Sequence, residues 1–291
     1  MNLLTFRFAP SPNGELHLGH AHSVLLNRKL ADAFAGRMLL RMEDIDTTRC
    51  TPAFKTGILR DLAWLGVAWE GKVRRQSEHF GNYEAVLHRL IDEELVYPAF
   101  MSRGEIRAFI AESGGGGRDW PRDPDGVPLY PRADKTLSTQ ERKRRIAHGL
   151  PFAWRLDVDA AMQRIAAPLT WLEYDDEALS GTHRVEARPQ DWGDVIVARR
   201  EIPTSYHLAV VVDDALQQIT HVVRGSDLYS ATAVQRVLQK LLGLPEPAYF
   251  HHRLILDAEG RKLSKSAGDT GIAALRNAGV TPETVRRMAK L

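Results

Sequence analysis

The sequence predicts an α/β protein with a doubly wound parallel sheet, interrupted by an α+β insertion and followed by a short C-terminal helical segment. Near both ends of the chain, short apolar runs typical of strands alternate with stretches whose apolar residues recur at helical spacing. This alternation favours parallel strands joined by right-handed crossovers. It breaks down over roughly residues 98–190, which indicates an inserted unit.

The expected elements follow in order along the chain. Residues 3–8 and 37–42 are short apolar runs and are expected to be strands. Acidic residues come directly after the second run, at the edge where open α/β sheets bind ligands. Apolar stripes at helical spacing predict helices at 21–34, 52–65, 78–95 and 231–242.

After residue 98 the chain is rich in glycine and proline, which predicts loops. Strands are expected around a smaller unit at 155–157, 167–171 and 195–198. Strand character then resumes, for the larger sheet, at 209–212 and 219–223.

Composition restricts the class of protein. The 291 residues, 44% hydrophobic and 26% charged, suit a globular protein with one large domain or two. No run of about 18 apolar residues predicts a membrane span, and the N-terminus resembles no secretory signal. Cys50 is the only cysteine, so a reducing cytoplasm is the expected compartment. Basic residues cluster at 142–145 and 286–290, where they could contact phosphates or simply form solvated helix faces.

Two short segments predict an ATP site. His17, Gly19 and His20 lie where a strand and a turn give way to a helix, whose N-terminal N–H groups suit phosphate. Gly19 has no Cβ, so a ribose or adenine can approach the backbone. Near the other end, residues 262–266 place the ammonium groups of Lys262 and Lys265 beside two hydroxyls. The two histidines alone could merely flank a turn, but with the second segment they indicate nucleotide chemistry.

On these residues the chain resembles the class I aminoacyl-tRNA synthetases of the glutamyl type. Six segments carry the resemblance in order, from about residue 4 to 268: 7–11, 17–20, 41–46, 206–214, 221–225 and 262–266. The resemblance implies a Rossmann-like catalytic domain in two halves, 1–97 and 191–245. The segment 98–190 would be an insertion that binds the acceptor, and 246–291 a loop followed by a C-terminal helix.

Only 25 residues follow the segment 262–266, where a full glutamyl-tRNA synthetase has an anticodon-binding domain. The chain is therefore more similar to the shorter paralogues in that family, which attach glutamate to queuosine at the wobble position of tRNA(Asp). This resemblance implies Mg²⁺ and ATP, activation of L-glutamate without tRNA, and tRNA(Asp) carrying queuosine as partner. It also implies a cytoplasmic monomer with no membrane partner.

Residue roles follow from the same resemblance. Arg7 and Arg224 are expected to bind the carboxylates of glutamate, in an order left open, and Glu43 its ammonium. His17, Gly19, His20 and Lys265 are expected to bind ATP. The catalytic set comprises His17, His20, Lys265 and the weaker candidate Lys262, which would stabilise charge. The full set expected to contact glutamate is Arg7, Phe8, Ala9, Pro10, Ser11, Glu43, Tyr206 and Arg224.

One departure from the family concerns zinc. Its members often hold zinc in the insertion through three cysteines and a tyrosine. Here the cysteine positions hold Ala99, Met101 and Asp134, and only Tyr130 is retained. This set does not make a tetrahedral structural site, so zinc is expected to be absent. Packing would then hold the insertion, with Phe100, Trp120 and Trp154 as candidates.

Other functions remain open from the sequence alone. A small nucleotidyltransferase also fits His17 to His20, but it would leave Glu43, Tyr206 and Arg224 without an amino-acid substrate. A glutamyl-tRNA synthetase that charges a tRNA 3′ end and a non-catalytic tRNA-binding paralogue are the further alternatives. Glutamate is favoured over glutamine, because a neutral amide would leave a guanidinium without a charge partner.

Overall fold

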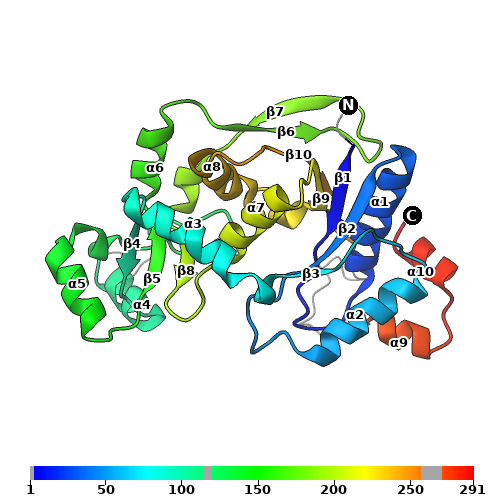
Figure 1. Ribbon diagram of the computed structural model, residues 1–291, viewed down its shortest axis with the longest axis horizontal. Helices are drawn as coiled ribbons and strands as arrows, with labels where there is room; N and C mark the ends of the chain where they lie inside the picture. The colour runs from blue at the N-terminus through cyan, green and yellow to red at the C-terminus, as the bar shows by residue number, and fades with distance from the viewer. Residues whose placement is uncertain (1–2, 114–119, 257–270) are drawn as a thin grey trace.

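The computed structural model describes residues 3–113, 120–256 and 271–291. The described strands form three sheets. Two of them meet where Thr220 N donates to the carbonyl of Thr5 at 3.0 Å, so that β1 and β9 lie side by side and the two together form the larger sheet (Figure 1). Across this junction the order is β3-β2-β1-β9-β10-β6-β7, and within each of the two sheets neighbouring strands are parallel except β6 and β7. The strands are β1 (Thr5–Phe8), β2 (Arg37–Met42), β3 (Arg74–Arg75), β6 (Thr170–Tyr174), β7 (Thr182–Glu186), β9 (His221–Gly225) and β10 (Ala248–His252).

Helices cover both faces of this arrangement, as expected for a doubly wound sheet. Successive residues of a strand face opposite sides, so Leu39 packs in one core and Leu40 in the other. Val222 and Val223 divide in the same way. One core contains α1 (Leu18–Ala33) and α2 (Pro52–Trp64), and the other α3 (Phe80–Asp92), α7 (Tyr206–Leu216) and α8 (Thr232–Leu242).

The expected strand at 209–212 is wrong, because these residues lie inside α7. The side chain of Ser205 caps the helix by accepting from Leu208 N, and residues 208–214 are all buried. A helix buried on every side shows no polar face, so a short apolar run of this kind reads equally well as a buried strand.

A smaller antiparallel sheet is made by β4 (Val96–Ala99), β5 (Ala153–Leu156) and β8 (Ile196–Arg199). Helices α4 (Arg103–Glu112), α5 (Thr139–Ala147) and α6 (Val158–Ile165) belong to the intervening chain. The expected placement of 167–171 in this smaller unit is wrong, because β6 pairs in parallel with β10, with Glu173 opposite Tyr249. The segment between the two halves of the larger sheet therefore contributes to that sheet.

Asp134 organises the centre of the smaller unit. Its carboxylate accepts from Tyr130 Oη and from the backbone N–H of Phe100 at 2.7 Å, and it pairs with Arg145 at 3.4 Å. The guanidinium of Arg155 lies 3.9 Å from the centroid of the Tyr130 ring. Among the residues that the structure describes, no cluster of three or more His, Cys, Asp or Glu side chains could hold a metal ion.

The aromatic candidates for packing in this unit lie in two places. Phe152 links Phe100 and Trp154 through ring contacts at 5.8 and 5.4 Å, whereas Trp120 packs on Phe109 and donates to the carbonyl of Leu129.

Two short helices near the C-terminus, α9 (Ile272–Asn277) and α10 (Pro282–Met288), pack beside α1 and α2 (Figure 1). Arg276 pairs with Asp61 of α2, and Arg286 donates to the carbonyl of Leu65 at 2.8 Å. Arg286, one of the basic residues considered for phosphate, thus has a structural partner. None of the helices in the described ranges is both long and apolar enough to cross a membrane.

Candidate active site

A cavity of about 1210 Å³ lies where the parallel strands end. Phe8 ends β1, Glu43 follows β2, Gly225 ends β9 and His252 ends β10, and all four line the cavity. The carboxyl ends of neighbouring parallel strands are where open α/β sheets bind ligands. The cavity contains every described residue of the expected site: Arg7, Phe8, Ala9, Pro10, Ser11, His17, Gly19, His20, Glu43, Tyr206 and Arg224.

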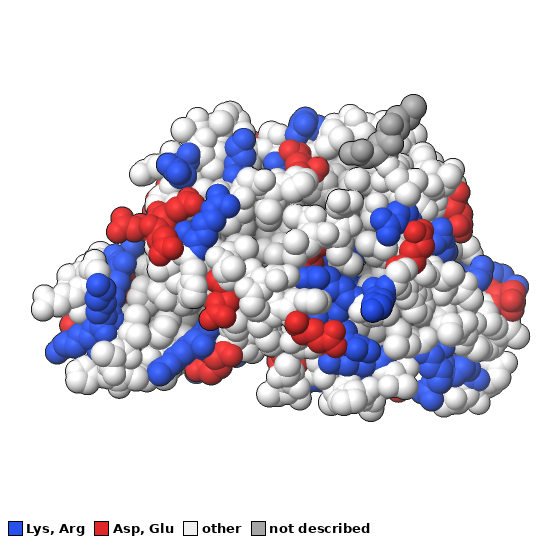
Figure 2. Space-filling view, viewed as in Figure 1, with Lys and Arg blue, Asp and Glu red and all other residues white. Residues whose placement is uncertain are grey.

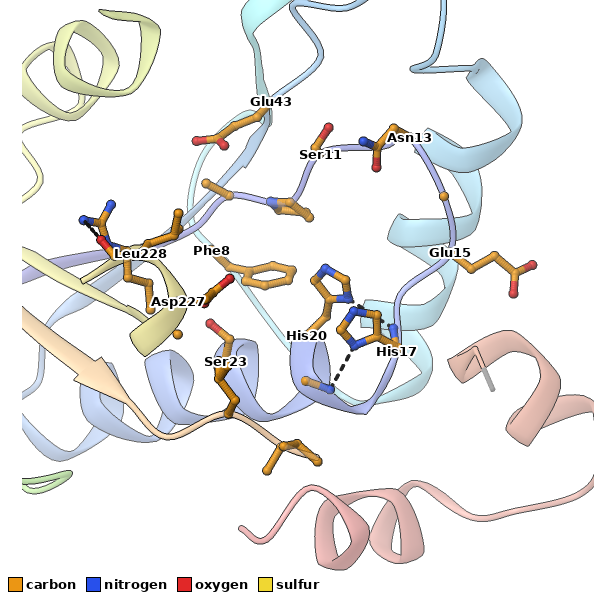
Figure 3. A pocket seen from close by; sticks show the side chains of 18 of the residues that line it. Phe8, Ser11, Asn13, Glu15, His17, His20, Ser23, Glu43, Asp227 and Leu228 are labelled. Carbon is orange, nitrogen blue, oxygen red and sulfur yellow. Dashed lines mark hydrogen bonds between the residues drawn. The ribbon is translucent and has the colours of Figure 1, made fainter. Parts of the chain in front are cut away.

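His17 and His20 cap the first turn of α1 reciprocally. The Nδ1 of His17 accepts from the backbone N–H of Gly19 at 3.1 Å, and the Nδ1 of His20 accepts from that of His17 at 3.2 Å. Figure 3 shows the two rings side by side where the loop from Ser11 enters the helix, and their centroids are 3.8 Å apart. Because each Nδ1 accepts, the proton of each neutral ring resides on Nε2, which is then a donor suited to phosphate oxygen.

Gly19 is needed for this arrangement. A Cβ at this position would lie 3.0 Å from Cε1 and 3.1 Å from Nδ1 of His17. The sequence suggested that Gly19 leaves room for a nucleotide. The structure gives a more local reason, because the missing Cβ leaves room for the imidazole that caps the helix.

A buried ionic network fixes the other end of the site. Arg41, fully buried, donates to Asp214 at 2.8 Å and to Glu43 at 3.2 Å, while Arg7 Nε donates to Asp214 at 3.3 Å. Burial opposes ionisation of Asp214, but Arg41 and Arg7 outweigh it and lower its pKa. Arg41 and Asp214 therefore connect Glu43, which is expected to bind an ammonium, with Arg7, which is expected to bind a carboxylate.

Glu43 stands in a different electrostatic position from Asp214. Burial raises the pKa of the Glu43 carboxyl, against the opposing effects of Arg41 and Arg7. Tyr206, at the N-terminus of α7, shares this space, and burial also raises the pKa of its phenol. Burial disfavours the ionised form of Glu43. An ammonium bound beside this carboxyl would offset that effect and favour the carboxylate.

Lys262 and Lys265 lie outside the described residues. The residues that flank this gap can be placed: Ile255 and Gly271 both line the cavity. Gly271 forms an isolated antiparallel bridge with His17, and Ile272 N donates to the carbonyl of Leu16 at 2.7 Å. The described chain therefore resumes next to His17, and residues close to both ends of the gap line the cavity.

Several residues of the cavity wall were not expected from the sequence, among them Asn13, Ser23, Asp227 and His252. Figure 3 shows Ser23 and Asp227 near one another, although they come from α1 and from the turn after β9. Asp227 could have been predicted from the sequence, because it follows an expected strand at the edge where such sheets bind ligands. Ser23 carried none, because a serine one turn inside a helix is common on any helix face.

Comparisons with known proteins agree with this geometry. A family model described as tRNA synthetases class I (E and Q), catalytic domain, matches residues 3–291. A glutamyl-Q tRNA(Asp) synthetase from Rhodobacter capsulatus is 42% identical over 98% of this chain and 99% of its own. A glutamate–tRNA ligase from a Synechococcus strain is 33% identical, and the chain spans 56% of that protein. The solved glutamate–tRNA synthetase from Elizabethkingia anophelis superposes with a TM-score of 0.73 at 26% identity, covering 92% of this chain and 54% of that one.

Proposed function

The chain belongs to the class I tRNA synthetases for glutamate and glutamine, a family of ligases, and within it we propose that this protein activates L-glutamate with ATP in the absence of tRNA. We further propose that it transfers the glutamate to queuosine in tRNA(Asp). The observation that carries the first step is one cavity that joins a histidine-capped helix N-terminus to two arginines and the partly buried carboxylate of Glu43.

The first step joins glutamate to AMP. An oxygen of the α-carboxylate attacks the α-phosphorus of ATP, the bond to the bridging oxygen breaks, and pyrophosphate leaves. His17 and His20 would donate Nε2–H to phosphate oxygens while Lys265, with Lys262, neutralises the charge that develops. Mg²⁺ would accompany ATP on its phosphates. The protein contributes in-line positioning and charge stabilisation, with no covalent intermediate on the enzyme.

Glutamate would fit the opposite end of the cavity. Arg7 and Arg224 provide two guanidiniums for two carboxylates, and Glu43 an acid for the ammonium. The backbone and side chains of residues 8–11 and the phenol of Tyr206 would complete the wall. Glutamine would leave one buried guanidinium without a charge partner, so glutamate is the proposed substrate.

The second step transfers glutamate from the adenylate. A hydroxyl of the queuosine cyclopentene diol attacks the carbonyl carbon, AMP leaves, and an ester forms as the hydroxyl proton is released. The near end-to-end match to a protein named for this reaction supports the assignment. An anticodon loop is single-stranded, so its wobble base can turn out of the stack to reach a cavity.

Basic side chains could hold the phosphates of such a loop. Figure 2 shows Lys and Arg side chains over the part of this face where Figure 1 places α5. Lys143 and Arg144 of this helix are exposed, although Arg144 already pairs with Glu141. Binding through such contacts should weaken as the salt concentration rises.

Exchange of labelled pyrophosphate into ATP tests the first step. Exchange is expected with glutamate and Mg²⁺ in the absence of tRNA. Exchange only with tRNA present, or faster exchange with glutamine, would refute this proposal.

Transfer of labelled glutamate tests the second step. Label should appear on tRNA(Asp) that carries queuosine, and not on the unmodified tRNA. The matches to glutamate–tRNA ligases favour the tRNA 3′ end as the competing acceptor. Removal of the 3′-terminal adenosine decides between them, because labelling of queuosine survives it and charging of the 3′ end does not.

A further inference from the structure

Arg224 is held by contacts unlike those of Arg7. Its Nε donates to Nε2 of His251 at 3.1 Å, and its Nη2 donates to Thr232 Oγ1 at 2.8 Å and to the carbonyl of Leu228 at 3.1 Å. All three acceptors are neutral groups when His251 is neutral. Nη1 of Arg224 is buried and has no hydrogen-bond partner among the described residues, so the guanidinium retains an unused donor.

His251 is in turn fixed by Glu173. The imidazole Nδ1 lies 3.0 Å from both carboxylate oxygens of Glu173, and the backbone N–H of His251 donates to Oε1 at 2.9 Å. The indole of Trp171 donates to Oε2 at 2.9 Å. The side chains of His251 and Glu173 are only 2% and 6% exposed, so water does not compete with these contacts.

These contacts dictate the tautomer of His251. A carboxylate accepts hydrogen bonds, so Nδ1 must carry the proton, and a guanidinium only donates, so Nε2 must carry the lone pair. The opposite tautomer would set N–H against the N–H of Arg224. Burial lowers the pKa of His251 despite the hydrogen bond to Glu173, and Arg224 adds to this effect. The neutral ring is thereby favoured.

The two arginines therefore differ in whether a carboxylate contacts the guanidinium. Arg7 shares a carboxylate, Asp214, with Arg41. Glu173 is connected to Arg224 only through the imidazole of His251, which lies between them. Three hydrogen bonds orient Arg224, and among the described residues no carboxylate forms an ion pair with it.

We propose that Glu173 and His251 are positioning residues that hold Arg224 in a fixed orientation with its charge available to a substrate carboxylate. This inference rests on the proposed function, in which Arg224 binds glutamate. Neither residue needs to touch the substrate, because each acts through the guanidinium.

Glu173→Gln tests the relay with little change of shape. The amide would place an N–H₂ group against one of the donors that now share the carboxylate, and the hydrogen bond to His251 Nδ1 would lose its charge assistance. The KM for glutamate should rise roughly tenfold or more, the scale of one charge-assisted contact, while the KM for ATP changes less than twofold. Equal rises of both KM values, or no change in a folded variant, would overturn the proposal.

Glu246→Gln is the matched control. Glu246 pairs with the buried Arg236 at 2.8 Å, and neither residue lines the cavity. This variant loses an acid behind a buried arginine just as Glu173→Gln does, but both KM values should stay within twofold of the wild type. If the glutamate KM of Glu246→Gln rose as much as that of Glu173→Gln, the rise in Glu173→Gln would reflect general destabilisation and the proposal would be wrong.

A second measurement separates the relay from the proposed function and does not depend on the folding of Glu173→Gln. Nitrogen-15 NMR of histidine side chains, assigned with His251→Gln, reports the tautomer of His251 in the substrate-free wild type. Protonation at Nδ1 alone near pH 7 is expected. Protonation at Nε2 refutes the relay even if glutamate-dependent exchange occurs. Absence of that exchange refutes the proposed function whichever tautomer is found.

Discussion

Arg41 of β2 and Asp214 of α7 form a buried ion pair of 2.8 Å between residues 173 positions apart in the chain. The same Arg41 donates to Glu43, and the same Asp214 accepts from Arg7. One ion pair therefore joins the first half of the larger sheet to the second and orients two groups of the cavity.

Arg41→Met should destabilise the protein strongly. The substitution leaves Asp214 buried without its closest cation, and loss of one partner of such a pair typically costs about 3–5 kcal/mol. Urea denaturation measures the loss. Arg75→Ala is the control, because Arg75 and Glu78 form an ion pair with side chains 44% and 55% exposed. That pair should contribute at most about 1 kcal/mol. Similar losses in both variants would contradict a structural role specific to Arg41.

Gly19→Ala should weaken ATP binding. The new Cβ would displace the His17 ring and with it the cap of α1. The KM for ATP in pyrophosphate exchange should rise roughly tenfold, equivalent to about 1.4 kcal/mol, with little change in the KM for glutamate. Gly57→Ala in α2 is the control, because a Cβ there meets no atom within 4 Å. An unchanged KM for ATP in Gly19→Ala would show that the His17 ring position does not matter for binding.

Lys265→Ala should act mainly on the rate of adenylate formation. Residues close to both ends of the gap that contains it line the cavity, and a cation there would stabilise charge that develops during the reaction. The expected fall in kcat is roughly 10²-fold, the scale of one oriented electrostatic group. A normal kcat with a raised KM for ATP would assign Lys265 to ground-state binding instead.

Asp134→Ala should destabilise the protein, whereas a chelator should not. The substitution removes the acceptor shared by Tyr130 and the backbone of Phe100, and unsatisfied buried donors cost about 1–3 kcal/mol each. Thermal unfolding with and without EDTA, together with elemental analysis, measures both effects. Asp125→Ala, at an exposed turn, is the control. Near-stoichiometric zinc, or a lower Tm in EDTA, would disprove the expectation that zinc is absent.

Stability should fall as the pH is lowered from about 6.5 to 4. Burial lowers the pKa of both His207 and His252 to about 4, whereas a histidine in the unfolded chain titrates near its ordinary value of about 6.5. Between these values the unfolded state binds protons that the folded state does not, so acid favours unfolding. Urea denaturation at pH 7, 6 and 5 measures the slope. His252→Gln should reduce it, and His88→Gln, at an exposed site, should not.

Local patterns in the sequence predicted much of the fold. Residues 37–42 form β2 with the expected bounds, and 52–65 match α2 to within one residue. The wrong strand at 209–212 has a physical cause, since a helix buried on all sides has the same apolar run as a buried strand. The pairing of β6 with β10 could not be predicted, because a strand's own residues do not reveal which sheet it joins.

The candidate site was predictable where it lies in contiguous motifs, and the structure brings those motifs to one cavity. The groups that orient the site were not predictable. Arg41 and Asp214 occur within the matching segments, but only the folded chain reveals their contact. Glu173 and His251 are 78 residues apart, and nothing in either local sequence connects them with Arg224.

The position of β6 limits which part of the segment 98–190 could be removed or exchanged as a separate module. Glu173 and Trp171 come from the stretch that separates the two halves of the larger sheet, yet they stand behind a residue of the cavity. Excising 98–190 would expose the edge of β10 and remove the acid that fixes His251. Grafting an insertion from another synthetase would meet the same obstacle unless β6 and β7 stayed with the recipient. The part that could be exchanged therefore ends before Thr170, and the hairpin that follows is inherited with the catalytic sheet.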